Sequence, residues 1–475
     1  MNKITKSPKT KPLSLKLLNS ECAGIDVGAR ELFVCIAKSP SEQEVRSFPT
    51  FTADLKRMIT WLKESGVKSV AMESTGVYWI VLYEMLDEAG FEVLLVNARF
   101  FRCVPGRKSD VQDCQWIQQL HSYGLLRGSF RPSNEIVELR AYVRQRGRLF
   151  DSAGTQVQLM HKALTQMNIQ LNHVISDITG LTGLNIIQAI LKGTRKPEVL
   201  ADLSVGGCRK NIDLIKKALE GNFRKEHVFA LEQAYKAYEF FHKQILECEK
   251  AIEQVLSAMQ PRTQPSVPES DADPVIRQKT QPVVSENNAD HVCCKKRAKK
   301  TTYNRSPYCF DAPDAIREVT VADLTTIPGI DANIAMKILS EIGMDVSAWK
   351  TVKEFTSWLG LSPGNKVSGG RILSSKTKPS NNRAAQALRM AAASLYRSKT
   401  AVGAFFRRMR SRLGAPKAVT AAAHKLARIL YRMLANGTNY WEVGENYYEQ
   451  QYQERVMASL KKRAKEFGYV LVPQQ

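Results

Sequence analysis

Between residues 20 and 126, short apolar runs alternate with stretches of helical periodicity, and their order restricts the possible folds more than any other feature. Strands are expected at residues 21–27, 31–37, 44–48, 68–72 and 91–96, and helices at 52–65 and 77–89. The order is therefore β-β-β-α-β-α-β. Strands and helices interleaved in this way predict an α/β fold around a mixed sheet.

Acidic residues stand where two of these strands end. Asp26 ends the first strand and Glu73 ends the fourth, while Asp110 and Asp113 share one face at the start of the next helix. Carboxylates gathered at one sheet edge would repel each other unless cations neutralise them. Such a set suits Mg²⁺ or Mn²⁺ and could bind two metals on a phosphodiester. Taken singly, each acid could instead be a solvated strand end or a favourable helix start.

Two long segments after residue 131 carry apolar residues every seven positions. The rows are Ile136, Val143, Phe150, Val157 and Leu164, then Leu139, Ala153, Met160 and Met167 with Arg146 as the interruption, and later Leu231, Tyr238, Ile245, Ile252 and Met259. This period predicts an antiparallel helical hairpin, an intermolecular coiled coil, or both. Core helices of a simple bundle are the alternative.

The positive charge is unevenly distributed. The chain of 475 residues has a formal net charge of +23, and residues 355–441 contain sixteen Lys or Arg and no acid. A solvated face normally mixes both signs, so a single-sign stretch of 87 residues indicates a phosphate-bearing partner. The stretch also contains Ser368 beside two glycines, with Lys366 and Arg371 close by. We expect Ser368 in an exposed, flexible loop, and Ser362, Ser374 and Ser375 are rival candidates for a nucleophile.

Changes in composition and pattern along the chain predict the domain boundaries. We expect a basic tail at 1–19, an α/β domain at 20–130, a helical region at 131–259, a Pro-rich linker or insertion at 260–313, a mainly helical domain at 314–440 and a helical tail at 441–475. Residues 324–339 resemble a helix-hairpin-helix, although Asp331 replaces the usual glycine and a purely structural hairpin is equally compatible. No apolar run is long enough to span a bilayer and no secretory signal is present, so we expect a cytoplasmic protein.

The acidic layout resembles the RuvC-like, ribonuclease-H-fold DEDD domain of the IS110/IS1111 family of insertion-sequence transposases. The segment Arg107-Lys108-Ser109-Asp110-Val111-Gln112-Asp113 is similar to the family's motif around its last two acids, and residues 167–180 and 360–371 extend the similarity. The resemblance implies that Asp26, Glu73, Asp110 and Asp113 bind Mg²⁺ or Mn²⁺ and that Ser368 is the nucleophile.

The resemblance also implies the partners. They are donor and target DNA, a structured non-coding guide RNA from the element, and further copies of the chain as a homodimer or homotetramer, acting at the nucleoid. Contacts to nucleic acid are expected from Arg107, Lys108, Lys366, Arg371, Lys376, Lys378 and Arg383. The expected function is a DNA transposase or site-specific recombinase that works by phosphodiester transesterification. A RuvC-like hydrolytic nuclease on branched DNA and a non-enzymatic nucleic-acid scaffold are the alternatives.

Overall fold

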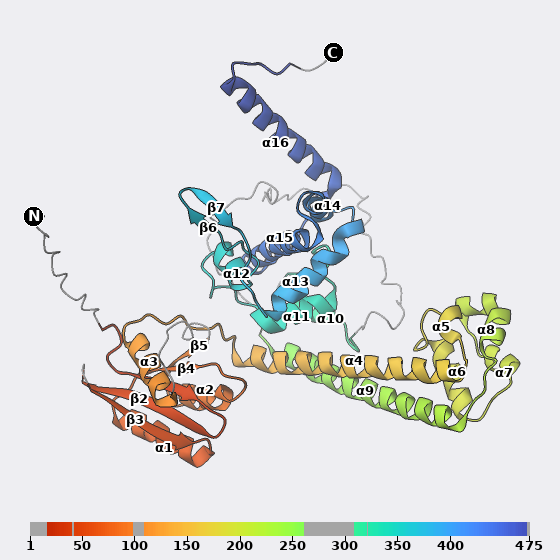
Figure 1. Ribbon diagram of the computed structural model, residues 1–475, viewed down its shortest axis with the longest axis horizontal. Helices are drawn as coiled ribbons and strands as arrows, with labels where there is room; N and C mark the ends of the chain where they lie inside the picture. The colour runs from red at the N-terminus through yellow and green to blue at the C-terminus, as the bar shows by residue number, and fades with distance from the viewer. Residues whose placement is uncertain (1–16, 40–41, 98–108, 261–307, 321, 473–475) are drawn as a thin grey trace, which may run out of the picture. The chain divides into compact units, whose positions relative to one another are not determined.

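The computed structural model describes residues 17–39, 42–97, 109–260, 308–320 and 322–472. The chain divides into two compact units, which we call the N-terminal unit (Met1–Arg131) and the C-terminal unit (Pro132–Gln475). Each unit is described by itself below, and Figure 1 labels the helices and strands of both.

A five-stranded mixed sheet forms the centre of the N-terminal unit. The strands are β1 (Cys22–Val27), β2 (Glu31–Ser39), β3 (Glu42–Pro49), β4 (Ser69–Glu73) and β5 (Glu92–Val96), in the order β3-β2-β1-β4-β5. The pairs β1–β2 and β2–β3 are antiparallel, whereas β4 runs parallel to both β1 and β5. The predicted α/β fold with a mixed sheet is confirmed, and it fits a ribonuclease-H-like fold.

Helices cover both faces of this sheet (Figure 1). Helices α1 (Thr52–Glu64) and α2 (Trp79–Glu88) pack on the face to which Ile25, Val70 and Met72 contribute. Helix α3 (Asp110–Ser122) packs on the other face, where Ile117 meets Ala71 and Val96. Because successive strand residues point to opposite faces, Asp26 and Glu73 lie on the α3 face together with Gly24 and Ala71.

Two long helices dominate the first half of the C-terminal unit. Helix α4 (Asn134–Gln166) and helix α9 (Lys225–Ala258) run antiparallel side by side, as Figure 1 shows. The seven-residue rows lie largely in the interface shared by α4 and α9: Ile136, Val143, Leu164, Leu231, Ile245 and Ile252 are all buried. The rows are therefore used within one chain as a helical hairpin, and an intermolecular coiled coil is not confirmed.

The interruption of the heptad row is a buried ion pair. Arg146 and Glu249 are only 4% and 2% exposed, and an Arg146 guanidinium nitrogen lies 2.7 Å from a Glu249 carboxylate oxygen. The guanidinium also donates to Asn333 and lies over the ring of Tyr308. Arg146 thus joins the hairpin to the helices that follow residue 308.

Short helices form a lobe at the far end of this hairpin. They are α5 (Leu171–Val174), α6 (Leu181–Leu191), α7 (Pro197–Ala201), η2 (Gly206–Asn211) and α8 (Ile212–Ala218). Their apolar residues, such as Ile186, Ile187 and Leu200, continue the core formed by α4 and α9.

The rest of the C-terminal unit is mainly helical. Its elements are α10 (Ala312–Thr320), η4 (Leu324–Thr326), α11 (Ala332–Ile342), α12 (Val352–Trp358), β6 (Lys366–Ser368), β7 (Arg371–Ser374), α13 (Arg383–Ser394), η5 (Leu395–Arg397), α14 (Ala401–Leu413), α15 (Ala415–Asn436) and α16 (Gly444–Glu466). The antiparallel strands β6 and β7 correct the expectation of a flexible loop around Ser368. No helix in the described ranges is long and apolar enough to cross a membrane.

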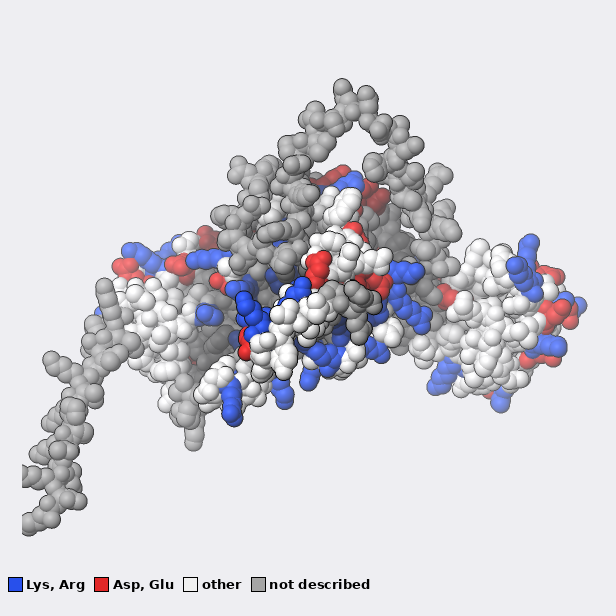
Figure 2. Space-filling model, turned by 90° about the horizontal axis from the view of Figure 1, so that it is seen from above, with Lys and Arg blue, Asp and Glu red and all other residues white. Residues whose placement is uncertain are grey.

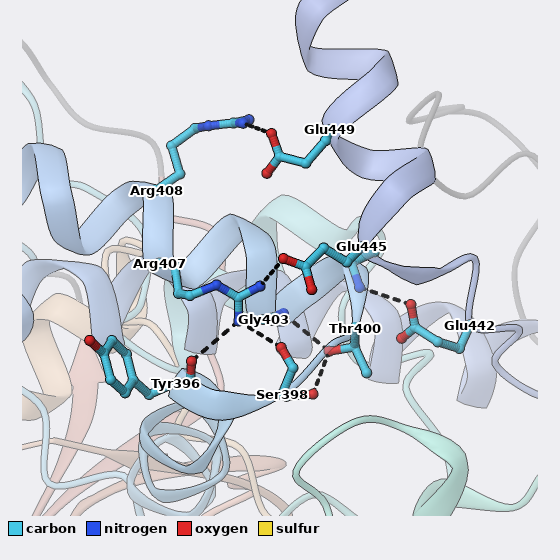
Figure 3. Close-up of polar contacts among 10 residues, drawn as sticks. Tyr396, Ser398, Thr400, Gly403, Arg407, Arg408, Glu442, Glu445 and Glu449 are labelled. Atoms are coloured by element: carbon cyan, nitrogen blue, oxygen red, sulfur yellow. Dashed lines mark hydrogen bonds and ion pairs between the residues drawn. The ribbon is translucent and has the colours of Figure 1, made fainter.

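Acidic residues that follow residue 441 form ion pairs with arginines of the acid-free stretch 355–441. The Arg407 guanidinium lies 2.6 Å from the Glu445 carboxylate and donates to the carbonyl oxygens of Tyr396 and Ser398, and Arg408 pairs with Glu449 (Figure 3). These contacts attach the first turns of α16 to α14.

Candidate functional site

Gly24 allows α3 to approach β1 closely. A Cβ atom at this position would lie 2.2 Å from the backbone nitrogen of Gln118 and 2.5 Å from the carbonyl oxygen of Cys114, so no larger residue fits. Sequence reasoning did not single out Gly24, although a glycine inside an apolar strand is a recognised sign that another backbone approaches. The close approach holds α3, at Cys114 and Gln118, against β1, the strand that carries Asp26.

The four predicted carboxylates converge on this edge. Asp26 and Glu73 follow directly on the paired residues Ile25 and Met72 of the parallel strands β1 and β4. Asp110 and Asp113 occupy the first turn of α3. The electrostatic environment of Asp26 shows the convergence, because Asp110, Glu73 and Asp113 all act on its ionisation.

The pKa of Asp26 is raised to about 6. Partial burial is the main cause, since it disfavours the charged form, and repulsion from Asp110, Glu73 and Asp113 adds to it. A carboxyl group with this pKa holds a proton more tightly than usual and gains from a nearby cation. The donor set therefore fits a hard divalent metal ion, which prefers carboxylate oxygens.

The carboxylates are nevertheless not drawn together around a common point. Among the described residues, no three His, Cys, Asp or Glu side chains are close enough to hold one ion. Glu73, for example, accepts a hydrogen bond of 2.9 Å from the hydroxyl of Thr75. The described residues therefore show neighbouring carboxylates but no formed metal site.

The two basic residues predicted beside the acidic pair lie outside the part of the chain that the structure describes. Arg107 and Lys108 do not belong to the described residues. The following residue, Ser109, is the N-cap of α3, and its hydroxyl accepts a hydrogen bond from the backbone nitrogen of Gln112. This cap begins the helix at Asp110 and so places both acids in its first turn.

Ser368 lies at the tip of an exposed hairpin in the C-terminal unit. It is the last residue of β6 and is paired with Arg371, the first residue of β7, across Gly369 and Gly370. Its side chain is exposed and makes no hydrogen bond with another described residue. The Ser368 hydroxyl is thus accessible to a large substrate.

The rival serines have different surroundings. Ser362 is half-buried and donates its hydroxyl to Thr356 at 2.9 Å, next to the buried end of α12. Ser374 is half-buried at the end of β7, and its hydroxyl accepts from the backbone nitrogen of Lys376. Ser375 is exposed but lies past the strand. Access therefore favours Ser368 and Ser375 over the other two.

The predicted nucleic-acid contacts of the C-terminal unit are all on the surface. Lys366, Arg371, Lys376, Lys378 and Arg383 are exposed, and Arg383 begins α13, whose first turn contains no acid. On the face shown in Figure 2, many Lys and Arg side chains lie around the middle of the view, with some Asp and Glu among them.

The structure explains why Asp331 replaces the glycine that is usual in a helix-hairpin-helix. Asp331 is the N-cap of α11, and its carboxylate accepts the backbone N–H of Ile334 at 2.8 Å. A carboxylate in this place occupies the N–H groups that would otherwise bind a phosphate. The preceding turn packs tightly instead, since a Cβ at Gly329 would lie 2.6 Å from the carbonyl oxygen of Ala391 on α13.

Comparison with protein families gives two matches. Residues 23–169 match a family of DEDD transposases of the IS110 type, described as "Transposase". Residues 321–407 match the "Transposase IS116/IS110/IS902 family". A comparison with curated proteins found no match.

The matched regions coincide with the two candidate sites. The first begins in β1 and contains all four carboxylates, and the second contains the hairpin with Ser368. The DEDD domain suggests a requirement for divalent metal, and a transposase implies DNA as partner. From the sheet, the carboxylates and both family matches, we conclude that the chain belongs to the IS110 family of transposases.

Proposed function

We propose that this transposase cleaves and exchanges DNA strands with Ser368 as the nucleophile. The observation that carries the proposal is the exposed Ser368–Arg371 pair at the hairpin tip, inside 87 residues without an acid. A hydroxyl beside a guanidinium is suited to attack a phosphodiester, because the positive charge stabilises the charge that develops on the phosphate.

The exchange needs no external energy source. The Ser368 oxygen forms a bond to phosphorus, the bond from phosphorus to one deoxyribose oxygen breaks, and the hydroxyl proton leaves to solvent or a base. The released deoxyribose oxygen takes up a proton. A hydroxyl of the second strand then attacks the phosphoserine, which restores the Ser368 hydroxyl and joins the new strand. Lys366, Lys376 and Lys378 are proposed to hold the flanking phosphates.

Asp26, Glu73, Asp110 and Asp113 are proposed to hold Mg²⁺, or Mn²⁺ in its place. When bound, the metal would neutralise the charge of a phosphodiester and polarise its oxygens. The raised pKa of Asp26 supports this role, because the charged form of its carboxylate is disfavoured in the protein alone and a bound cation would stabilise it. Without metal, Asp26 keeps its proton up to a pH of about 6.

We further propose a guide RNA and a homodimer or homotetramer. The RNA is supported by the family resemblance and by the acid-free stretch of residues 355–441, which would bind its backbone without reading sequence. Exchange of two strands requires more than one serine. Because the heptad rows are buried within the hairpin, self-association would use apolar residues that stay exposed on it, namely Leu159, Phe229, Phe240 and Leu246.

Detection of a covalent protein–DNA species tests the nucleophile. The protein with its co-purifying nucleic acid is incubated with labelled duplex DNA that spans one end of the element, and the products are separated on a denaturing gel. Wild type and the matched control Ser375→Ala are expected to form the adduct, and Ser368→Ala is not. An adduct that persists in Ser368→Ala would refute the assignment.

A metal-dependent hydrolytic nuclease is the second candidate, and the clustered carboxylates favour it. This alternative predicts strand cleavage without an adduct, abolished by Asp26→Asn and unaffected by Ser368→Ala. If neither substitution changes any reaction on DNA, the chain acts as a nucleic-acid scaffold.

A further inference from the structure

The hairpin of β6 and β7 has a well-defined turn. Gly369 and Gly370 connect the strands, and both have positive φ angles, 53° and 75°. Two consecutive residues in the left-handed region are typical of a type I′ turn, whose twist matches that of a two-stranded hairpin. The tip is therefore formed by a specific turn that requires glycine.

The hairpin exposes large apolar side chains. Val367, Ile372 and Leu373 are 59%, 63% and 70% exposed. Val367 is paired with Ile372, so both project from one side of the ribbon, whereas the next pair, Ser368 and Arg371, projects from the opposite side. The side of Val367 and Ile372 is thus apolar and the other carries the candidate nucleophile, while Leu373 lies where the strand register shifts and has no paired residue.

The base of the hairpin is anchored, in contrast to its tip. The backbone nitrogen of Gly364 donates to the carbonyl oxygen of Lys376 at 3.0 Å, and Pro363 bridges to Thr377. Leu361, just before them, is buried. An isolated two-stranded ribbon is only marginally stable in water. An anchored ribbon with a bare apolar side is therefore suited to enter a partner.

Charge identifies the partner. Lys366, Arg371, Lys376 and Lys378 surround the apolar residues, and the nearest acids in the sequence are Glu354 and Glu442. A partner for this surface must combine dense negative charge with apolar faces. Duplex DNA does so, because phosphates border each groove and base pairs expose their faces once unstacked.

We infer that the β6–β7 hairpin is a wedge that unstacks duplex DNA beside the phosphodiester attacked by Ser368. Val367 and Ile372 enter between base pairs, while the surrounding lysines and Arg371 hold the phosphates on either side. Unstacking bends the backbone outward and presents the phosphorus to the opposite side of the ribbon, where Ser368 stands. The inference rests on the proposed function, since it assigns a second role to the same hairpin.

The test uses the full chain with its co-purifying nucleic acid and a duplex that spans one end of the element. 2-Aminopurine is placed in turn at each adenine near that end, and its fluorescence reports unstacking. Wild type should raise the fluorescence several-fold at one step. The variant Val367→Ser/Ile372→Ser/Leu373→Ser should lose at least four-fifths of that rise, while its DNA affinity falls less than about threefold.

Two controls make the result specific. Val470→Ser/Leu471→Ser removes apolar residues that are exposed elsewhere and should behave as wild type. The triple variant should form little adduct on the intact duplex. A duplex with a two-base mismatch at the same step is already unstacked, so it should restore adduct formation to the triple variant. Circular dichroism and the thermal midpoint establish that the triple variant is folded, as expected for side chains at an exposed tip.

The possible failures are distinguishable. Equal fluorescence in wild type and triple variant, or no rescue by the mismatch, would overturn the wedge and leave Ser368 as the nucleophile. A change of oligomeric state with normal unstacking would overturn it too and identify the hairpin as a contact between copies. Conversely, if unstacking depends on the hairpin but Ser368→Ala still forms the adduct, the wedge stands and the proposed nucleophile fails.

Discussion

Arg146 on α4 and Glu249 on α9 form an ion pair that water does not reach, and both partners have further contacts in the C-terminal unit. The second Glu249 oxygen accepts the backbone N–H of Cys309 at 2.8 Å, and Arg146 also contacts Asn333 on α11. Nearby, Arg144 on α4 binds both carboxylate oxygens of Glu341 on α11. The helical hairpin and the mainly helical region after residue 308 are therefore joined by charged groups.

Glu249→Ala should destabilise the C-terminal unit by about 3–5 kcal/mol, because it leaves a buried guanidinium without its counter-charge. Arg146→Leu/Glu249→Leu should recover much of that loss, since it removes both charges together. Urea unfolding of each variant, followed by circular dichroism, gives the comparison. A double variant no more stable than Glu249→Ala would show that the desolvated charge is not the source of the loss.

Asp26→Asn should alter the pH dependence of stability. The folded-state pKa of Asp26, about 6, exceeds its ordinary value, so folding binds a proton and stability falls as the pH rises from about 4 to 6. The asparagine variant avoids this loss and should melt at a higher temperature than wild type at pH 7.5 in EDTA, with little difference below pH 4.

The same pair of proteins tests metal binding. Mg²⁺ should raise the thermal midpoint of wild type at pH 7.5 and that of Asp26→Asn much less, because the variant lacks a ligand. Asp87→Asn, which removes an exposed carboxylate on α2, is the control. Equal responses to Mg²⁺ in wild type and Asp26→Asn would contradict a metal site at this edge.

Gly24→Ala should displace α3 and cost about 1–3 kcal/mol, because the added methyl group collides with the backbone of Gln118 and Cys114. The displacement should also weaken the stabilisation by Mg²⁺, since Asp110 and Asp113 move with the helix. Gly147→Ala is the matched control, for its Cβ meets no atom within 4 Å and alanine favours a helix. Urea titration with and without Mg²⁺ measures both effects, and an unchanged response to the metal would disprove the coupling.

Glu445→Gln/Glu449→Gln should strengthen binding to non-specific DNA. The substitutions release Arg407 and Arg408 from their partly exposed ion pairs, at a stability cost below about 1 kcal/mol. Two additional phosphate contacts would steepen the slope of log K against log salt by up to about 2. Fluorescence anisotropy at several salt concentrations measures this slope, with Glu454→Gln as control. An unchanged slope would mean that neither arginine reaches DNA.

Much of the N-terminal unit could be predicted from the sequence. The five strands and two helices lie within about two residues of their expected positions, because alternating and helical periodicities follow directly from burial on one face or two. The convergence of Asp26 with Glu73 was predictable for the same reason. The contribution of Gly24 was not, since a close approach depends on the partner helix.

In the C-terminal unit, local sequence patterns alone could not decide between alternative structures. A seven-residue period is identical for pairing within a chain and between chains, so only the structure shows that Ile136 and Leu231 are buried within one chain. Likewise, Gly369 and Gly370 suit a flexible loop as well as a type I′ turn. Asp331 departed visibly from the helix-hairpin-helix pattern, and its role as N-cap explains the departure.

The helical hairpin also fixes the distance between the α10–α11 region and the lobe of α5–α8. From Arg146, where α4 meets the α10–α11 region, to the end of α4 at Gln166 the helix advances about 30 Å at 1.5 Å per residue. The lobe of α5–α8 is therefore held at the end of a stiff arm that spans about nine base pairs of duplex DNA at 3.4 Å each. Two contact points at the ends of this arm therefore lie about 30 Å apart.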